Sequence, residues 1–268
     1  MTQSQAITLP WTGPRIAVLE ISGAIGQQVR GMDLVRTIRS LTNDPRVKAV
    51  VVQIDSPGGS APVSDAIFRQ LRKLSKKKPT VASILGSGLS GGYLVACGTR
   101  HVIALPTSLV GSIGVIFVRP VIEELLTKIG VRVEVTHLGK LKGMFQPWHE
   151  PTPEEQAKVK ALTAEYYDWF VNAVAEARGM DRAKVREYAT GEVFSGAKAK
   201  EIGLIDELGD FETAVKKARS LADLPQKPRL QFVRPRRPLL ERLMSRGVSA
   251  QSIAAEIEER LLPRIEFR

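Results

Sequence analysis

Apolar and polar positions along the chain follow two alternating patterns, one typical of buried strands and one typical of amphipathic helices. Nearly continuous apolar runs predict strands at residues 15–22, 47–54, 79–85, 101–105, 114–118 and 131–136. Helical spacing predicts helices at residues 31–42, 62–77, 91–98 and 120–129. A longer helix is expected from the N-cap Thr152, with Glu155 three residues on as in a capping box, to about Arg178. The alternation predicts an α/β fold, a mostly parallel sheet with helical cover.

The pattern changes after residue 222. Several prolines and the basic stretch Lys227–Arg237, which contains no acid, predict a linker. From Leu239 to Leu262 apolar residues recur largely at spacings of three and four, which predicts an amphipathic C-terminal helical extension. The predicted division is an N-terminal arm at 1–14, a globular domain at 15–222, and a basic linker with an amphipathic tail at 223–268. The mixed charges of the tail favour packing on an adjacent subunit over a membrane surface.

The most informative residues lie at 86–93, with the sequence Gly-Ser-Gly-Leu-Ser-Gly-Gly-Tyr. They follow a predicted buried strand and lead into a predicted helix, so Ser90 stands at the edge where open α/β sheets bind ligands. Unpaired N–H groups at a helix N-terminus favour a developing negative charge there. Ser90 is therefore a candidate nucleophile, although a tight turn without chemistry would carry the same residues.

A second glycine-rich loop, Asp-Ser-Pro-Gly-Gly-Ser at 55–60, ends the predicted strand one βαβ unit earlier. The carboxyl ends of neighbouring parallel strands meet at one edge, so free N–H groups of this loop can point to the same place as Ser90. That is the geometry of an oxyanion hole. Each loop alone is explained by an ordinary turn, but two at adjacent strand ends favour a functional site.

These residues resemble the motifs of a known family. The loop at 55–60, Ser-Gly-Gly-Tyr at 90–93 and Thr-Ser-Leu-Val-Gly-Ser-Ile-Gly-Val at 107–115 are similar to signal peptide peptidase A and its relatives. These are serine–lysine peptidases of the Clp protease/crotonase superfamily. The similarity continues through 139–143, 151–155, 191–200 and 203–209, so it spans about residues 15–222. It implies a Clp/crotonase-like catalytic domain and an ATP-independent serine endopeptidase that hydrolyses peptides or unfolded segments.

A serine hydroxyl needs an adjacent base to act as a nucleophile. Spacing alone does not exclude the three histidines, His101, His137 and His149, although each is more typical of an exposed or core-edge position. A lysine can also serve as the base where burial keeps its amine neutral. From the residues alone, Lys140 and Lys142 are both candidates.

The family pattern implies a base at Lys142, 52 residues after the nucleophile, and an orienting hydroxyl at Ser112, 22 residues after it. The resemblance further implies an acyl-enzyme mechanism in which Lys142 accepts the proton of Ser90. Backbone N–H groups of Gly59 and Gly91 would bind the oxyanion, with Gly58 shaping the loop.

Composition and charge bear on the compartment and the partners of the protein. The 268 residues carry a net charge of +11 and a single cysteine, Cys97, which excludes an intrachain disulfide and fits a reducing compartment. No run is apolar enough for a transmembrane helix, and the first 14 residues lack the features of a signal peptide, so we expect a cytoplasmic protein. The basic linker can bind nucleic acid or anionic lipid, but a solvated linker explains its charge as well. We expect no nucleic-acid partner and leave peripheral membrane contact open.

Two other functions fit the same residues. A crotonase-like acyl-CoA hydratase or isomerase also polarises a carbonyl with two loop N–H groups, and a catalytically silent scaffold would use only the tail and basic linker. No zinc-ligand spacing, P-loop or GxGxxG motif is present, so no metal or cofactor is expected. The expected partners are a peptide or protein substrate and further copies of the chain, which would cover exposed sheet edges and the aromatic long helix.

Overall fold

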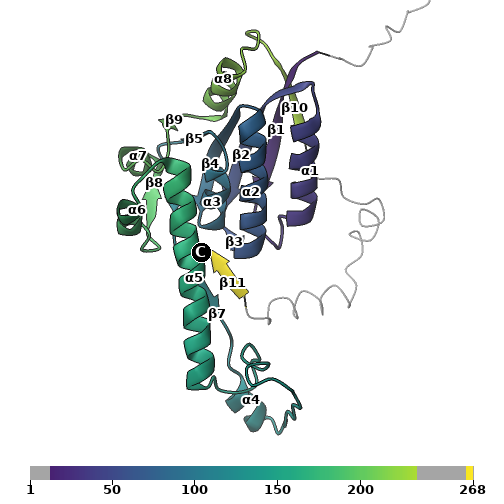
Figure 1. Ribbon diagram of the computed structural model, residues 1–268, viewed down its shortest axis with the longest axis vertical. Helices are drawn as coiled ribbons and strands as arrows, with labels where there is room; N and C mark the ends of the chain where they lie inside the picture. The colour runs from purple at the N-terminus through teal and green to yellow at the C-terminus, as the bar shows by residue number, and fades with distance from the viewer. Residues whose placement is uncertain (1–12, 234–263, 268) are drawn as a thin grey trace, which may run out of the picture.

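The computed structural model describes residues 13–233 and 264–267 and has a mostly parallel sheet at its centre (Figure 1). Six strands lie in the order β10-β1-β2-β4-β5-β9, each parallel to its neighbours. They are β1 (Arg15–Ser22), β2 (Val47–Ser56), β4 (Thr80–Leu89), β5 (His101–Ala104), β9 (Glu207–Leu208) and β10 (Arg229–Val233). The short strand β6 (Leu109–Gly111) continues parallel to the end of β4 and pairs antiparallel with β8 (Val193–Ser195).

A second, smaller sheet lies at the carboxyl edge of the first. Its order is β3-β11-β7, with β11 (Arg264–Phe267) antiparallel to both β3 (Gly59–Ser60) and β7 (Ile116–Val118). The central strand of this sheet thus comes from a part of the chain far from the other two.

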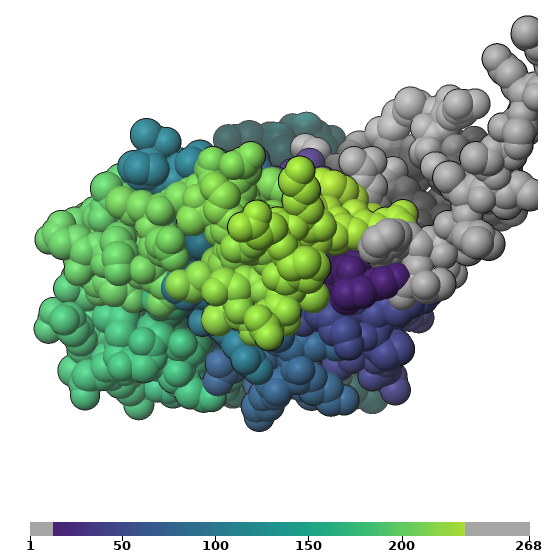
Figure 2. Space-filling model, turned by 90° about the horizontal axis from the view of Figure 1, so that it is seen from above, coloured from purple at the N-terminus to yellow at the C-terminus, as the bar shows by residue number. Residues whose placement is uncertain are grey.

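Helices cover both faces of the main sheet (Figure 1). One face carries the larger core and is covered by α1 (Gly31–Asn43), α2 (Ala61–Lys77), α3 (Gly91–Cys97) and α5 (Pro153–Arg178). The other is covered by α8 (Phe211–Leu221). The remaining helices are α4 (Glu123–Lys128), α6 (Arg182–Tyr188) and α7 (Gly196–Glu201). From above, the yellow-green segment with α8 and β10 lies between the green segment of α5 to α7 and the purple start of β1 (Figure 2).

The strand predictions follow from burial on both faces of the sheet. In β1, Ala17 and Leu19 face the larger core and Ile16 faces the smaller one, so the run is apolar throughout.

The long helix begins as its sequence predicts, because Thr152 and Glu155 form a complete capping box. Phe170 of its aromatic cluster is fully buried in the larger core.

Two sequence predictions need correction, and two others lie wholly or partly outside the described residues. The alternating residues 131–136 are not a strand, because no described strand pairs with them and all six are exposed. Residues 229–233, assigned to the linker, are instead strand β10 on the edge of β1, because their backbone pairs with that edge. The predicted tail helix at 239–262 lies outside the described residues, and so do residues 1–12 of the N-terminal arm. Among the helices described, none combines the length and apolarity needed to cross a bilayer.

Candidate active site

Ser90 lies at the turn between β4 and α3, as the N-cap residue of α3. Its backbone φ of 51° and ψ of −117° are rarely adopted by residues with a side chain. Nucleophilic serines of α/β hydrolases sit on a strained strand-to-helix turn of this kind. The residue is fully buried, and its Oγ has no hydrogen-bond partner within the described part of the chain. A buried hydroxyl held without a partner at a strained turn is poised for a role other than stabilising the fold.

The glycines after Ser90 allow the turn to pack against the neighbouring loop. A Cβ on Gly91 would lie 2.3 Å from Oγ of Ser64 and 3.5 Å from the backbone N of Gly59. A Cβ on Gly92 would lie 2.8 Å from the carbonyl oxygen of Ser56. The two glycine-rich loops are therefore in close contact, and a side chain at either position would push them apart.

Gly58 and Gly59 have φ values of 101° and 141°, which favour glycine. The N–H of Gly58 donates to Oγ of Ser56 at 3.2 Å, so this group holds the loop instead of facing a ligand. The carbonyl of Gly58 accepts from the N–H of Ile25 at 2.7 Å. A Cβ on Gly59 would lie 2.2 Å from the carbonyl oxygen of Ile25, so only glycine fits beside that strand-like segment.

Asp55 links the two loops, a role that the sequence analysis did not identify. Its Oδ1 accepts from both the N–H (2.9 Å) and the hydroxyl (3.0 Å) of Ser87. Gly86 packs against the same carboxylate, because a Cβ there would lie 2.7 Å from Oδ1. The contact depends on β2 and β4 being neighbours, so a motif in the sequence offers no direct signal for it.

Strand β6 brings Ser112 to the same edge as Ser90. Leu89 is opposite Gly111 in the parallel pair of β4 and β6, and the N–H of Ser90 donates to the carbonyl of Gly111 at 2.8 Å. Ser112 is buried, has a φ of 49°, and donates its N–H to the carbonyl of Glu192 at 2.7 Å. The structure thus brings together Ser90, Ser112 and the two glycine loops.

Lys142 is placed elsewhere. It is exposed, and its N–H closes a turn onto the carbonyl of Gly139 at 3.0 Å. Nearby, Lys140 forms an ion pair with Glu154 in the first turn of α5. Phe170, sixteen residues further along α5, shares the core with α3, and a helix rises about 24 Å over that distance. Within one chain the predicted base is therefore separated from Ser90, and Figure 1 shows the α4 segment at the far end of α5.

The histidines are also distant from Ser90. His101 is opposite Val81 at the start of β4, about 26 Å from the end of that strand, and its Nε2 lies 3.1 Å from Glu207. His137 and His149 flank Gly143 in the loop that carries Lys142. Carbonyl groups of Gly143 and Glu150 accept hydrogen bonds from the His149 ring and raise its pKa. This ring fixes the loop, and within one chain none of the three histidines reaches the nucleophile.

Comparisons with known proteins identify the family of the chain. Residues 72–225 match Peptidase family S49. The Synechocystis sp. protein named "Putative protease slr0021" is 37% identical over 244 residues, which cover 91% of this chain and 87% of that protein. "Serine protease SPPA, chloroplastic" of Arabidopsis thaliana is 32% identical over 244 residues, which cover 86% of this chain but only 36% of that longer protein.

Solved structures with a similar fold are known. A mutant of ClpP1 from Listeria monocytogenes superposes with a TM-score of 0.51 at 16% identity, covering 74% of this chain and 94% of that one. At this identity the likeness concerns the fold alone, and it confirms the Clp/crotonase-like architecture implied by the resemblance. With the match over residues 72–225 and the 37% identity to a relative covered over 87% of its length, the chain belongs to the S49 family of serine proteases, the family of signal peptide peptidase A.

Proposed function

We propose that this chain is an ATP-independent endopeptidase that cleaves peptides or unfolded segments through an acyl-enzyme on Ser90. The observation that carries the proposal is the buried Oγ of Ser90, which has no hydrogen-bond partner among the described residues and lies at a strained turn beside Gly59 and Gly91. Attack by this oxygen on a peptide carbonyl would place the oxyanion near the N–H groups of these two glycines. The amine leaves with the proton taken from Ser90, and water then hydrolyses the ester.

The base in this proposal is Lys142, supplied to Ser90 by a second copy of the chain. The length of α5 separates Lys142 from Ser90 within one chain, and the exposed turn around Lys142 leaves it accessible to a neighbour. Ser112, next to the nucleophile, would then orient a lysine that enters from outside. The site is incomplete without the second copy, which supports a homo-oligomer.

The surface around Lys142 supports the same assembly. The segment before Lys142, residues 116–138, carries large apolar residues that are 38% exposed or more: Ile116, Val118, Val121, Leu125, Ile129, Val131, Val133, Val135 and Leu138. Exposed apolar residues gathered in one segment of the chain favour an interaction site, and a neighbouring copy would remove them from water. Such a contact would also give a partner to the stretch at 131–136, which pairs with no strand in the described part of the chain.

A serine-directed fluorophosphonate probe tests the proposed chemistry. The wild-type chain should form a covalent adduct located at Ser90 by peptide mass spectrometry, and Ser90→Ala should form none. Ser220→Ala, on the surface of α8, is the matched control and should label normally. An unlabelled wild-type protein that keeps its fold would favour the scaffold or acyl-CoA alternatives, which need no nucleophilic serine.

A further inference from the structure

Strand β11 lies in the position that an extended peptide would take beside the proposed active site. Its backbone pairs with β3 through Phe267 opposite Gly59 and Glu266 opposite Ser60. On its other side it pairs with β7, with Arg264 opposite Val118. Figure 1 shows β11 as the yellow strand next to β3, β7 and α5. The segment therefore fills a gap between two strands that do not pair with each other in the described chain.

The direction of β11 leads towards the nucleophile. From residue 264 to residue 267 the strand passes from Val118 to Gly59, the glycine whose N lies 3.5 Å from the Cβ position of Gly91. Adding a strand to a free sheet edge is a general mode of peptide recognition, in which the main chain gives affinity and pockets for alternate side chains give specificity. A peptide bound in this register would run its backbone towards the proposed oxyanion site.

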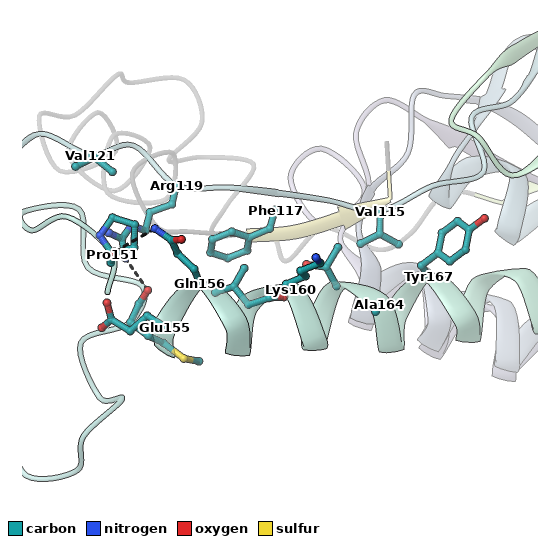
Figure 3. A pocket seen from close by; sticks show the side chains of 13 residues that line it. Val115, Phe117, Arg119, Val121, Pro151, Glu155, Gln156, Lys160, Ala164 and Tyr167 are labelled. Atoms are coloured by element: carbon teal, nitrogen blue, oxygen red, sulfur yellow. Dashed lines mark hydrogen bonds between the residues drawn. The ribbon is translucent and has the colours of Figure 1, made fainter. Parts of the chain in front are cut away.

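A cavity of about 670 Å³ lies on one side of this groove, between β7 and α5. Figure 3 shows Val115 and Phe117 on one wall of the cavity and Ala164 and Tyr167 of α5 on the other. Side chains directly opposite in paired strands share a face. A bound peptide would therefore direct the residue opposite Phe117 towards this cavity, together with residues two positions away.

The lining of the cavity favours an apolar occupant. Its charged groups at one end have other partners: Glu155 completes the capping box, and Arg119 donates to the carbonyl groups of Met144 and His149 at 2.7 Å. Three more polar side chains of α5 also line the cavity, Gln156, Lys160 and Thr163. The rest of the lining is mostly apolar and includes Val115, Phe117, Val159 and Ala164. In the chain, the residue at the register position opposite Phe117 is Ile265.

We propose that the groove between β3 and β7 is a binding site for extended peptides with an apolar residue opposite Phe117, and that residues 264–267 occupy it in competition with substrate. The chain then carries its own competitive inhibitor. This inference rests on the proposed peptidase function for its effect on turnover, but peptide binding can be measured without turnover.

Binding is tested in the Ser90→Ala background, with and without residues 264–268. The probe is a fluorescent peptide with the sequence of residues 263–268, Pro-Arg-Ile-Glu-Phe-Arg, followed by anisotropy. We expect the shortened chain to bind this peptide at least severalfold more tightly than the full chain. In the full chain, Glu266→Pro removes a backbone donor from a central strand and should have the same effect without changing the length. Equal affinity in all three proteins would overturn the proposal.

The cavity is tested on the shortened chain with two matched changes on α5. Ala164→Leu fills the cavity and should weaken binding of the peptide severalfold, whereas Ala161→Leu, exposed on the same helix but not lining the cavity, should not. A peptide with aspartate in place of the isoleucine should also bind weakly. Equal effects of the two α5 changes would show that the peptide lies elsewhere.

Turnover separates the two proposals. With Ser90 present, removal of residues 264–268 should raise kcat/KM for peptide hydrolysis severalfold, and the added peptide should inhibit competitively. Hydrolysis that is unaffected by the deletion would reject the competing strand and leave the peptidase intact. Peptide binding as predicted without any hydrolysis would instead retain the groove and reject the peptidase.

Discussion

Ser90 and Ser112 follow two neighbouring parallel strands at the same level, and both have a positive φ. Leu89 is opposite Gly111, and the next residue on each strand has a positive φ, 51° for Ser90 and 49° for Ser112. The N–H of Ser90 donates to the carbonyl of Gly111, which joins the two turns at 2.8 Å. Holding a residue in such a conformation lowers the stability of the fold by on the order of 1–3 kcal/mol, and strain of this kind is concentrated at functional sites.

Replacement of Ser90 by glycine should abolish turnover and raise stability. Glycine adopts a φ of 51° without strain, so the free energy of unfolding should rise by about 1 kcal/mol, measured by chemical denaturation. Asp223→Gly is the control, because Asp223 also has a positive φ, 50°, but is exposed and distant from the site. It should stabilise the chain and leave activity unchanged. A Ser90→Gly enzyme with normal turnover would remove Ser90 from the mechanism.

Mixing two inactive variants should restore activity if Lys142 comes from a second copy. Ser90→Ala and Lys142→Ala should each be inactive alone, and random mixing in equal amounts should recover about a quarter of the sites in a symmetric assembly. Subunit exchange is verified by native mass spectrometry. Lys140→Ala is the control and should stay active, because that side chain pairs with Glu154. Full activity in Lys142→Ala would return attention to the other candidate bases.

Loss of the Ser112 hydroxyl should lower kcat, but by less than loss of Lys142. Ser112 lies beside the nucleophile and in the proposed mechanism orients the incoming lysine without bonding to the substrate. We expect KM to stay near its wild-type value, because only orientation of the base is affected. Steady-state kinetics of Ser112→Ala checks this. An unchanged kcat would show that the hydroxyl does not position the base.

Gly91→Ala should disrupt the site through a single contact. The new Cβ would lie 2.3 Å from Oγ of Ser64, so the turn that carries Ser90 must shift. Removing the opposing side chain in the double variant with Ser64→Gly should restore part of the lost activity, which a double-mutant cycle measures. Activity equally low in the single and double variants would mean that the glycine serves a purpose other than close packing.

Cys97 should be unreactive in the folded protein. Burial raises the pKa of its thiol from 9.0 to about 11, so little thiolate exists at pH 8 and reagents lack access. A raised pKa in the folded state means that this group's contribution to stability is present below about pH 9 and is lost as the pH rises towards 11. Cys97→Ala should reduce the loss of thermal stability over that interval. Rapid thiol labelling of the native chain at pH 8 would contradict the burial.

The sequence by itself determined the elements that bury their own side chains. The apolar runs of β1, β2 and β4 and the capping box of α5 carry their signal within a few residues, because burial on both faces and N-capping are local requirements. The two glycine loops could be located for the same reason, because their glycines occupy turns that follow buried strands.

Tertiary structure alone decided which remote segments meet. The pattern of residues 131–136 fits a strand, but a strand needs a partner and the described chain supplies none. Strands β10 and β11 follow no strong pattern of their own, and each exists because its backbone pairs with an edge formed by distant residues. The same limit applies to the site. Spacing places Lys142 52 residues after Ser90, but the length of α5 keeps the two apart in one chain, because sequence distance does not determine distance in space.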